Sequence, residues 1–424
     1  MLSMNILWVS NQIFPDFAPT LHQNKPINGG WQFGMAKDLV NAGIELSIAT
    51  VRPNIPDTQK KIEGIHYYLL QGKKSILHYD ASLEQKWKSI VEKIQPDVIH
   101  IHGTEYAHGL ALVKACPQVK IVVSIQGLVG VISRYYRGQM PLLDILKNLT
   151  LRDILRQNSI WHAQRKFQKR GKLIEKKYLT LCTHFIGRTQ WDHDHVISGN
   201  PKAMYHFCNE SLRDAFYTAP KWVMKNINRH TLFLSQALYP IKGLHKVLDA
   251  LPLVREVFPD VQVRVAGMDI TKTATLMDKL RLDNYGKYIK KQLKKLGLAQ
   301  QVTFTGPLDE QGMVGEYLAC HAFVCPSNIE NSPNSLGEAQ LLGVPCIASY
   351  VGGVPDMVDH GKTGLLYRFE ETEMLAQHII RLFQQDALAQ ALGENGIPEA
   401  RDRHNRKTNC ETTLAIYKKI RDSE

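Results

Sequence analysis

Short apolar runs alternate with longer helical segments along nearly the whole chain, and this alternation constrains the fold more than any other feature. Such alternation is typical of parallel β-strands joined by crossover helices. The sequence predicts strands at 5–10, 45–51, 65–70, 98–102, 120–125 and 184–187, and then at 231–235, 262–266, 302–305, 322–325, 345–349 and 364–367. Two such series indicate an α/β protein with two doubly wound, Rossmann-like domains.

The length of 424 residues also favours two domains over a single hydrophobic core. We place the N-terminal domain at 1–217 and the C-terminal domain at 230–404. Residues 218–229 lack a clear period and are interpreted as the linker, and a helix at about 405–424 is expected to pack back on the first domain. Ligands of doubly wound sheets bind at the carboxyl ends of strands, so we expect the two domains to face a shared cleft.

Basic residues are concentrated in residues 131–180, which contain twelve lysines and arginines against three acidic residues, in a chain whose formal net charge is +12. Apolar residues are interleaved with these charges. One interpretation is peripheral contact with an anionic membrane, since basic amphipathic helices bind lipid headgroups. The other is that the helices pack their apolar faces on the domain and leave the lysines in solvent. No nucleic-acid-binding motif accompanies the charge, so a nucleic-acid partner is not expected.

The remaining composition favours a cytoplasmic protein. Seven scattered cysteines, none in a Cys-x-x-Cys pair, predict neither a disulfide framework nor a zinc site. We therefore expect no metal and no cofactor. No apolar run approaches the roughly 20 residues that span a bilayer, and the first residues resemble a strand more than a signal peptide.

The segment from Glu330 to Glu338 joins the strand at 322–325 to a helix expected to begin near Ser335. Asn334 is a suitable N-cap residue, and the amide groups and dipole of a helix N-terminus can hold a diphosphate. Glu338 then lies about one turn into the helix, where its two carboxylate oxygens could accept hydrogen bonds from a ribose diol. Glu330 lies on the incoming loop, placed to touch a sugar. The candidate binding residues of this loop and helix are Asn331, Ser332, Pro333, Asn334, Ser335, Leu336 and Glu338.

This loop resembles the Glu-x7-Glu motif of the retaining glycosyltransferases of family 4. The agreement extends to Pro326-Ser327 before the motif and to residues 343–356 after it. The resemblance implies the GT-B fold and makes Lys242, before the helix-opening Gly243, a phosphate-binding residue. Ala237 stands where the family commonly has an arginine, so part of the expected charge is missing. Gly306 matches a Thr-Gly turn that commonly lies against the nucleobase, and it can equally be a plain strand-to-helix turn.

The resemblance also covers the first half of the chain. Gly29 and Gly30 match a glycine pair that faces the diphosphate. His102 ends a predicted strand at the side where the cleft is expected. Gln126 stands where many members have a histidine that contacts the transferred sugar, and an amide cannot act as a general base. Arg188 either contacts a phosphate or pairs with a carboxylate one helical turn away.

Together these features predict a metal-independent, retaining hexosyltransferase that uses a nucleoside-diphospho sugar, with UDP favoured and GDP possible. The expected acceptor is a hydroxyl of a growing glycan or lipid-linked saccharide at the inner face of the plasma membrane, in capsule, exopolysaccharide or lipopolysaccharide synthesis. The predicted catalytic group is Lys242, Glu330, Gln126 and His102. The alternatives are a non-catalytic nucleotide-sugar-binding protein and a UDP-sugar epimerase on the same fold.

Overall fold

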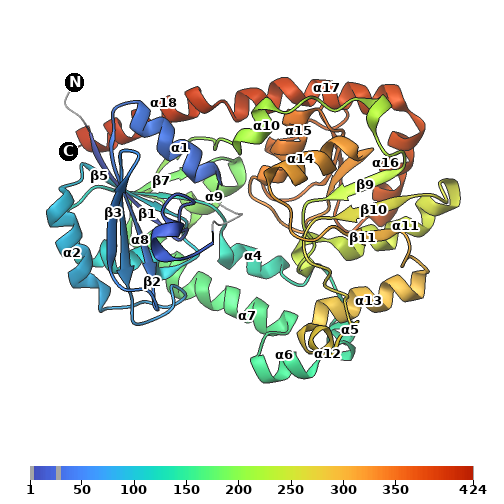
Figure 1. The fold of residues 1–424 in the computed structure, drawn as a ribbon, viewed down its shortest axis with the longest axis horizontal. Helices are drawn as coiled ribbons and strands as arrows, with labels where there is room; N and C mark the ends of the chain where they lie inside the picture. Colours follow the sequence, from blue (N-terminus) through green and yellow to red (C-terminus); the bar gives the residue numbers. More distant parts are fainter. Residues whose placement is uncertain (1–3, 25–29, 424) are drawn as a thin grey trace. The chain divides into compact units, whose positions relative to one another are not determined.

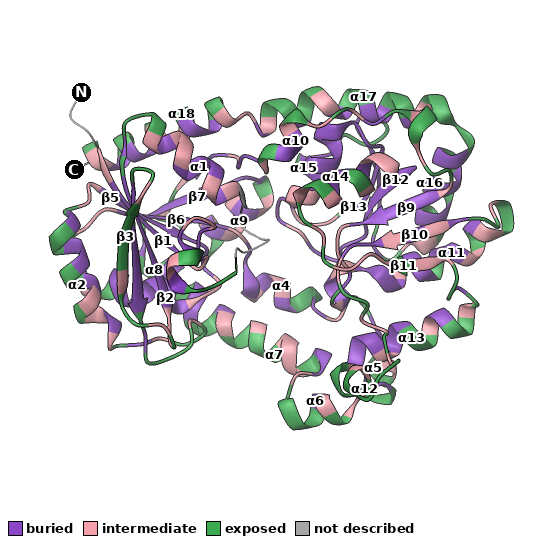
Figure 2. Ribbon diagram, in the orientation of Figure 1, coloured by how far each residue is buried: buried purple, intermediate pink, exposed green. Residues whose placement is uncertain are grey.

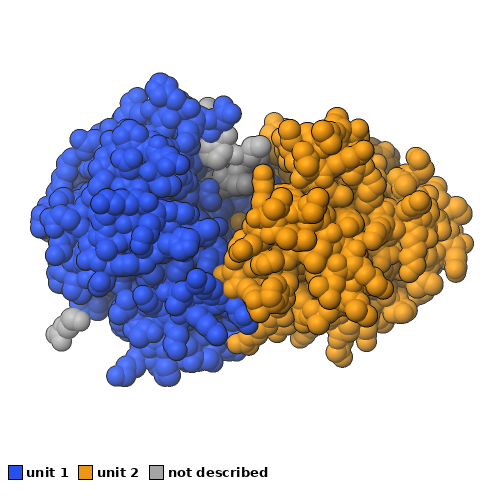
Figure 3. Space-filling model, turned by 90° about the horizontal axis from the view of Figure 1, so that it is seen from below, with its two compact units in different colours: residues 1–131, 168–213, 404–424 blue, residues 132–167, 214–403 orange. Residues whose placement is uncertain are grey.

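The computed structural model describes residues 4–24 and 30–423. By their internal contacts the residues divide into two compact units, coloured separately in Figure 3. Unit 1 comprises residues 1–131, 168–213 and 404–424, and unit 2 comprises residues 132–167 and 214–403. The segment 132–167, which the sequence analysis assigned to the first domain, is thus grouped with unit 2. The C-terminal helix is grouped with unit 1.

Unit 1 is built on an eight-stranded sheet with the order β3-β4-β2-β1-β5-β6-β7-β8 (Figure 1). Neighbouring strands are parallel, except for the antiparallel pair β3 and β4. The strands are β1 (Asn5–Ser10), β2 (Glu45–Arg52), β3 (Thr58–Ile62), β4 (Ile65–Gln71), β5 (Val98–His102), β6 (Ile121–Ser124), β7 (His184–Gly187) and β8 (Met204–Phe207). The strand order reverses between β1 and β5, which is where a ligand of such a sheet is expected.

Helices cover both faces of this sheet. On one face the core joins α2 (Leu83–Ile94), α3 (Leu110–Ala115) and α8 (Lys176–Leu181) to the strands through Trp87, Leu112 and Tyr178. On the other face α1 (Gly30–Asn41) and α18 (Arg406–Asp422) pack through residues such as Leu39 and Tyr417. α9 (Gln190–Gly199) follows β7. Buried strands between two helical layers give the continuous apolar runs seen in the sequence.

Unit 2 contains a six-stranded, fully parallel sheet with the order β11-β10-β9-β12-β13-β14. Its strands are β9 (Thr231–Leu234), β10 (Gln262–Val265), β11 (Val302–Phe304), β12 (Ala322–Cys325), β13 (Cys346–Ser349) and β14 (Leu365–Tyr367). This is the order of a doubly wound nucleotide-binding sheet, and it reverses between β9 and β12. The loops that follow these two strands therefore mark the expected ligand site of unit 2.

The helices of unit 2 come from two separate parts of the chain, residues 132–167 and residues 214–403. α10 (Asp214–Thr218), α11 (Leu244–Val257), α13 (Asn284–Leu296), α14 (Glu310–Ala319), α15 (Asn334–Leu342), α16 (Thr372–Gln384) and α17 (Asp386–Arg403) come from the second half of the chain. α4 (Val129–Tyr135), α5 (Leu142–Lys147), α6 (Leu151–Arg156), α7 (Ile160–Arg170) and α12 (Leu276–Arg281) complete the set (Figure 1). α4 and α7 straddle the boundaries of the two units.

The twelve predicted strands are all confirmed, with ends that shift by one residue at most. Two further strands, β3 and β8, were missed. β3 has the sequence Thr-Gln-Lys-Lys-Ile and is largely exposed, so it lacks the apolar signal of a buried strand. Burial along the sheets is shown in Figure 2. The segment 218–229, interpreted as the linker, lies along unit 2, where the Trp222 indole donates to the Cys320 carbonyl at 2.8 Å.

Candidate functional site

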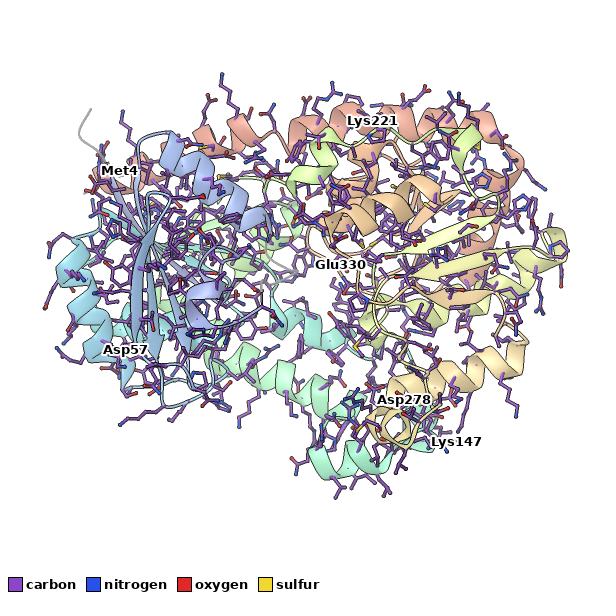
Figure 4. All side chains as sticks on the ribbon, viewed as in Figure 1. Met4, Asp57, Lys147, Lys221, Asp278 and Glu330 are labelled. Carbon is purple, nitrogen blue, oxygen red and sulfur yellow. The ribbon has the colours of Figure 1, made fainter. Side chains whose placement is uncertain are left out.

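The loops after β9 and β12 come together at the point where the strand order of unit 2 reverses. The first loop ends in a short 3-10 helix, Pro240–Lys242, and the second carries Glu330. The amide of Asn328 donates to the carbonyl of Ile241 at 2.7 Å, which ties the two loops together directly. Glu330 lies on the loop side of the sheet in Figure 4. The geometry thus places the predicted phosphate-binding and sugar-binding residues next to one another.

Lys242 and Glu330 form an ion pair with 2.5 Å between Nζ and Oε1, and both side chains are about 13–14% exposed. The Ser327 hydroxyl donates to the same carboxylate oxygen at 2.7 Å. Burial by itself lowers the pKa of Lys242, but the Glu330 carboxylate outweighs it, and the pKa of the ammonium is raised overall. Lys242 is therefore a positive charge at neutral pH, held in the site before any ligand arrives.

Gly243 permits the close approach of the two loops. It has a left-handed φ of 73°, and a Cβ atom here would lie 1.7 Å from the carbonyl oxygen of Pro326. Gly352 has the same function on the other side, because its Cβ would lie 1.9 Å from the carbonyl oxygen of Glu330. The backbone of the loop that carries Glu330 is thus held between two glycines.

We expect Gly243→Ala to destabilise the protein by more than roughly 3 kcal/mol, because the methyl group overlaps a backbone carbonyl. Gly361→Ala is a matched control. Gly361 has a similar φ of 78°, with nothing within 4 Å of its Cβ position, so it reports the left-handed strain alone, about 1–2 kcal/mol. Urea unfolding of the two variants measures the difference. Equal losses of stability would show that the loops do not need this close approach.

Helix α15 begins one residue earlier than predicted, at Asn334. Its N-cap residue is Pro333, which makes no side-chain cap, so the prediction of Asn334 as the N-cap is wrong. The amides of Leu336 and Gly337 donate to the Pro333 carbonyl at 3.0 and 3.4 Å. Those of Asn334 and Ser335 lie ahead of them in the first turn, where amides have no acceptor within the helix. This N-terminus can still bind an anion.

Glu338 is 4% exposed although it sits in a polar segment of the sequence. Its Oε2 lies 3.5 Å from the hydroxyl of Tyr317, which donates to the Ser335 carbonyl at 2.8 Å. Asn331 and Ser332 are buried as well. Burying a polar group costs free energy unless the group is hydrogen-bonded. The buried polar side chains of this segment therefore depend on polar contacts.

Gly306 follows β11 and has a φ of 80°, with open space at its Cβ position. Its amide donates to the Gly267 carbonyl at 3.1 Å, and the Gly267 amide donates back to the Gly306 carbonyl at 3.0 Å. Gly306 therefore forms a turn beside the end of β10. The structure fits both readings of this residue, the plain turn and the surface for a nucleobase.

In unit 1 the predicted residues Gln126 and Arg188 meet on Glu210, a residue that the sequence analysis did not single out. The Gln126 amide donates to Glu210 Oε1 at 2.6 Å, and Arg188 Nη1 pairs with Glu210 Oε2 at 2.5 Å. The pair of Arg188 with Asp192 involves only the Arg188 backbone amide, at 3.0 Å. Glu210 follows the missed strand β8, and recognising that strand would have drawn attention to the loop after it.

His102 lies in the same part of unit 1, at the end of β5. It lines a pocket with Trp8, Trp31, Arg188 and Glu210. Burial, reinforced by His100 and His108, lowers the pKa of His102 well below its usual value, so the imidazole is neutral. Its two ring nitrogens have no hydrogen-bond partner among the described residues. A neutral imidazole in a pocket that is also lined by two tryptophans can donate one hydrogen bond to a sugar hydroxyl and accept another.

The glycine pair expected to face the diphosphate is only partly described. Gly30 is the first residue of α1, and Gly29 lies outside the described residues. Within residues 4–24 and 30–423, no group of three or more His, Cys, Asp or Glu side chains is arranged to hold a metal ion. In the same part of the chain, no helix has both the length and the apolarity needed to cross a membrane.

Glu175 is a buried carboxyl of unit 1 that lies where Gly171 packs against Gly130. Its oxygens accept from the Gly130 amide at 3.3 Å. Burial, together with repulsion from Glu105, raises the pKa of Glu175 to about 7. The folded state therefore binds a proton more tightly than the unfolded state does. Stability from this group is present below about pH 4.5 and is lost as the pH rises through 7.

We therefore expect Glu175→Gln to flatten the pH dependence of stability. Between pH 5 and pH 8 the wild type should lose about 1–3 kcal/mol more free energy of unfolding than the variant does. Urea unfolding at the two pH values measures this difference. The exposed Glu373→Gln serves as control and should follow the wild type. Identical slopes for all three proteins would show that Glu175 is ionised in the folded state at neutral pH.

Residues 223–398 match the family model of Glycosyl transferases group 1. Spore coat protein SA of Bacillus subtilis is 24% identical over 391 residues, which are 89% of this chain and 90% of that protein. A D-inositol 3-phosphate glycosyltransferase of Actinosynnema mirum is 34% identical over 129 residues, which are 30% of this chain and 31% of that protein.

Solved structures show the same fold. Sucrose-phosphate synthase from Thermosynechococcus elongatus aligns with a TM-score of 0.69 at 17% identity, over 98% of this chain and 99% of that chain. Anabaena HepE in complex with UDP and glucose aligns with a TM-score of 0.64 at 17% identity, over 98% of this chain and 100% of that chain. The fold is thus GT-B, with two Rossmann-like α/β units. The protein is a glycosyltransferase, and the residues that match the group 1 family model lie in unit 2.

Proposed function

We propose that this glycosyltransferase transfers a hexose from a nucleoside-diphospho sugar, with UDP favoured as the nucleotide, and retains the anomeric configuration. The acceptor would be a hydroxyl of a growing glycan or lipid-linked saccharide, at the inner face of the plasma membrane. The single observation that carries this proposal is the ion pair of Lys242 and Glu330 at the switch point of the unit 2 sheet. A cation and a carboxylate side by side suit a phosphate and a sugar hydroxyl, respectively.

In this proposal unit 2 binds the donor. The Lys242 ammonium and the first-turn amides of α15 stabilise the negative charge that develops on the leaving diphosphate, which needs no metal ion. Glu330 accepts hydrogen bonds from the hexose, and Glu338 accepts them from the ribose diol. Gly306 would lie against the nucleobase. In a solved structure of the same fold, that of Anabaena HepE, UDP and glucose are the bound molecules, which supports UDP as the first donor to test.

Unit 1 would supply the groups around the transferred sugar and the acceptor. Gln126 and Arg188 are fixed by Glu210, and neutral His102 offers its imidazole to a hydroxyl. Gln126 and Arg188 cannot accept a proton, and His102 is only a weak base because burial lowers its pKa. We propose that the acceptor oxygen bonds to the anomeric carbon while the bond from that carbon to the phosphate oxygen breaks. The departing phosphate oxygen then takes the acceptor proton, on the same face of the sugar.

Two measurements test the proposal. Calorimetry with UDP-, GDP- and ADP-sugars identifies the donor, and we expect a UDP-sugar to bind most tightly. With that donor, the anomeric proton spectrum of the product should show retention. A product of inverted configuration would overturn the front-face mechanism. Release of no nucleoside diphosphate from any donor would favour a non-catalytic binding protein, and interconversion of the donor without an acceptor would favour an epimerase.

A further inference from the structure

Nine large apolar side chains of unit 2 are exposed on three short helices. We call them the α5–α6–α12 surface. They comprise Leu142 (54% exposed), Leu143 (66%) and Leu146 (61%) on α5, Leu151 (79%), Ile154 (59%) and Leu155 (82%) on α6, and Leu276 (75%), Met277 (55%) and Leu280 (61%) on α12. In Figure 2 the helices α6 and α12 are largely coloured as exposed. Monomeric soluble proteins rarely expose so many neighbouring apolar side chains without a partner.

The exposed side chains follow the helical period, so each helix presents an apolar face to the outside. On α6 they are at positions i, i+3 and i+4, and on α12 at positions i, i+1 and i+4. An amphipathic helix of a globular protein normally turns this face towards the core. Elsewhere in residues 131–180, Tyr136, Met140, Ile160 and Ile174 are buried, whereas Tyr135, Trp161 and Leu173 are exposed at 40%, 41% and 51%. The largest exposed fractions of apolar side chains in this stretch belong to α5 and α6.

Hydrogen bonds hold the three helices in this orientation, although α12 lies more than a hundred residues from α6 in the sequence. Arg152 at the start of α6 donates to the carbonyl of Arg281 at the end of α12, at 2.7 Å. Asn284, the first residue of α13, donates to the Ile145 carbonyl of α5 at 2.8 Å. Lys287 of α13 donates to the Leu149 carbonyl at 2.9 Å. Lys147 and Asp278, from α5 and α12, are labelled in Figure 4.

The charges around the apolar side chains are predominantly positive. Residues 142–156 and 272–281 contain six basic residues, Lys147, Arg152, Arg156, Lys272, Lys279 and Arg281, against three acidic ones. Two of the acidic residues, Asp153 and Asp278, are engaged in capping boxes at the starts of α6 and α12. The adjoining helix α13 adds five lysines and no acidic residue, and its N-cap residue Asp283 pairs with Arg152 at 3.8 Å. A second copy of this chain would meet this surface with like charge.

We propose that the α5–α6–α12 surface docks the protein on an anionic lipid bilayer, with the nine apolar side chains in the headgroup and acyl boundary. Apolar side chains rimmed by lysine and arginine match the apolar interior and the negative headgroups of such a leaflet. The assignment differs from a simple reading of the basic segment, because it includes α12 and leaves out the buried parts of 131–180. It depends on the exposed surface alone and not on the transfer chemistry.

Co-sedimentation with lipid vesicles tests this proposal. The full-length protein should bind vesicles of equal parts phosphatidylcholine and phosphatidylglycerol, and bind vesicles of phosphatidylcholine alone much more weakly. Leu276→Ser/Leu280→Ser on α12 and Leu151→Ser/Leu155→Ser on α6 should each weaken binding by roughly tenfold or more. The matched control is Leu253→Ser/Val257→Ser on α11, an exposed pair of the same spacing outside the surface, which should bind like the wild type.

Three outcomes would overturn the proposal. One is that the wild type fails to bind anionic vesicles, and another is that the α11 pair lowers binding as much as the α12 pair does. Alternatively, light scattering could show a wild-type dimer that the α6 and α12 variants dissociate, which would assign the surface to a second copy of the chain. Calorimetry of the donor with the α12 variant separates this proposal from the proposed function, because donor binding should be unchanged whether or not the vesicles are bound.

Discussion

Lys242→Met should lower the turnover of a nucleoside-diphospho sugar by about two to three orders of magnitude, because it removes the fixed positive charge that would face the leaving diphosphate in the proposed complex. A methionine keeps the length of the side chain but cannot donate a hydrogen bond. Steady-state release of the nucleoside diphosphate measures the effect. The exposed Lys362, whose side chain is 62% exposed, provides the control, and Lys362→Met should be as active as the wild type.

The same substitution should also lower the stability of the free protein by roughly 1–3 kcal/mol, since it leaves the Glu330 carboxylate nearly buried without its cation. The double variant Lys242→Met/Glu330→Gln separates the two effects. It removes the uncompensated charge, so stability should recover while turnover stays low. If turnover recovered together with stability, Lys242 would be a structural partner of Glu330 and not a phosphate-binding residue.

Glu338→Ala should lower kcat/KM for the donor by roughly 100- to 10,000-fold, because two hydrogen bonds to a carboxylate contribute about 1.5–3 kcal/mol each. Most of the loss should appear as a higher KM, since the ribose lies away from the reacting carbon in the proposed complex. The variant should remain folded, because its α15 neighbours in the core are unchanged. Kinetics with varied donor concentration, beside calorimetry of the free nucleotide, measure the effect.

Glu373→Ala on the exposed side of α16 is the control for a lost glutamate. Tyr317→Phe extends the test, because the Tyr317 hydroxyl lies 3.5 Å from Glu338 and donates to the Ser335 carbonyl. Its removal should cost less than removal of the carboxylate. Wild-type affinity for the nucleotide in Glu338→Ala would place the ribose elsewhere.

The strands of the two sheets could be predicted from the sequence because both are covered by helices on two faces. Buried parallel strands need apolar residues on both sides, and this leaves short continuous runs such as those of β5 and β12. The edge strands β3 and β8 were missed because β3 is largely exposed and the four-residue β8 has only one buried residue, so neither has such a run. The loop after β8 carries Glu210, so the residue that organises Gln126 and Arg188 was missed with its strand.

The placement of the basic segment could not be predicted, because it depends on which unit the helices contact. Charge and apolar content alone allowed either lipid contact or packing on the domain. The structure shows that one part of the segment packs inward, with Tyr136 and Met140 buried, while the leucines of α5 and α6 are exposed. The participation of α12 depends on contacts across more than a hundred residues, which no local pattern encodes.

By itself, the sequence determined the α/β class, the strands other than β3 and β8, and the residue types of the proposed donor site, since these depend on local periodicity and on short motifs such as that from Glu330 to Glu338. Only the tertiary structure decided that Lys242 and Glu330 share an ion pair, that Gly243 and Gly352 are needed for close backbone approach, and that Glu210 fixes the unit 1 group. The physical reason is that each of these features depends on distances between separate loops, and such distances are set by the packing of whole sheets and helices.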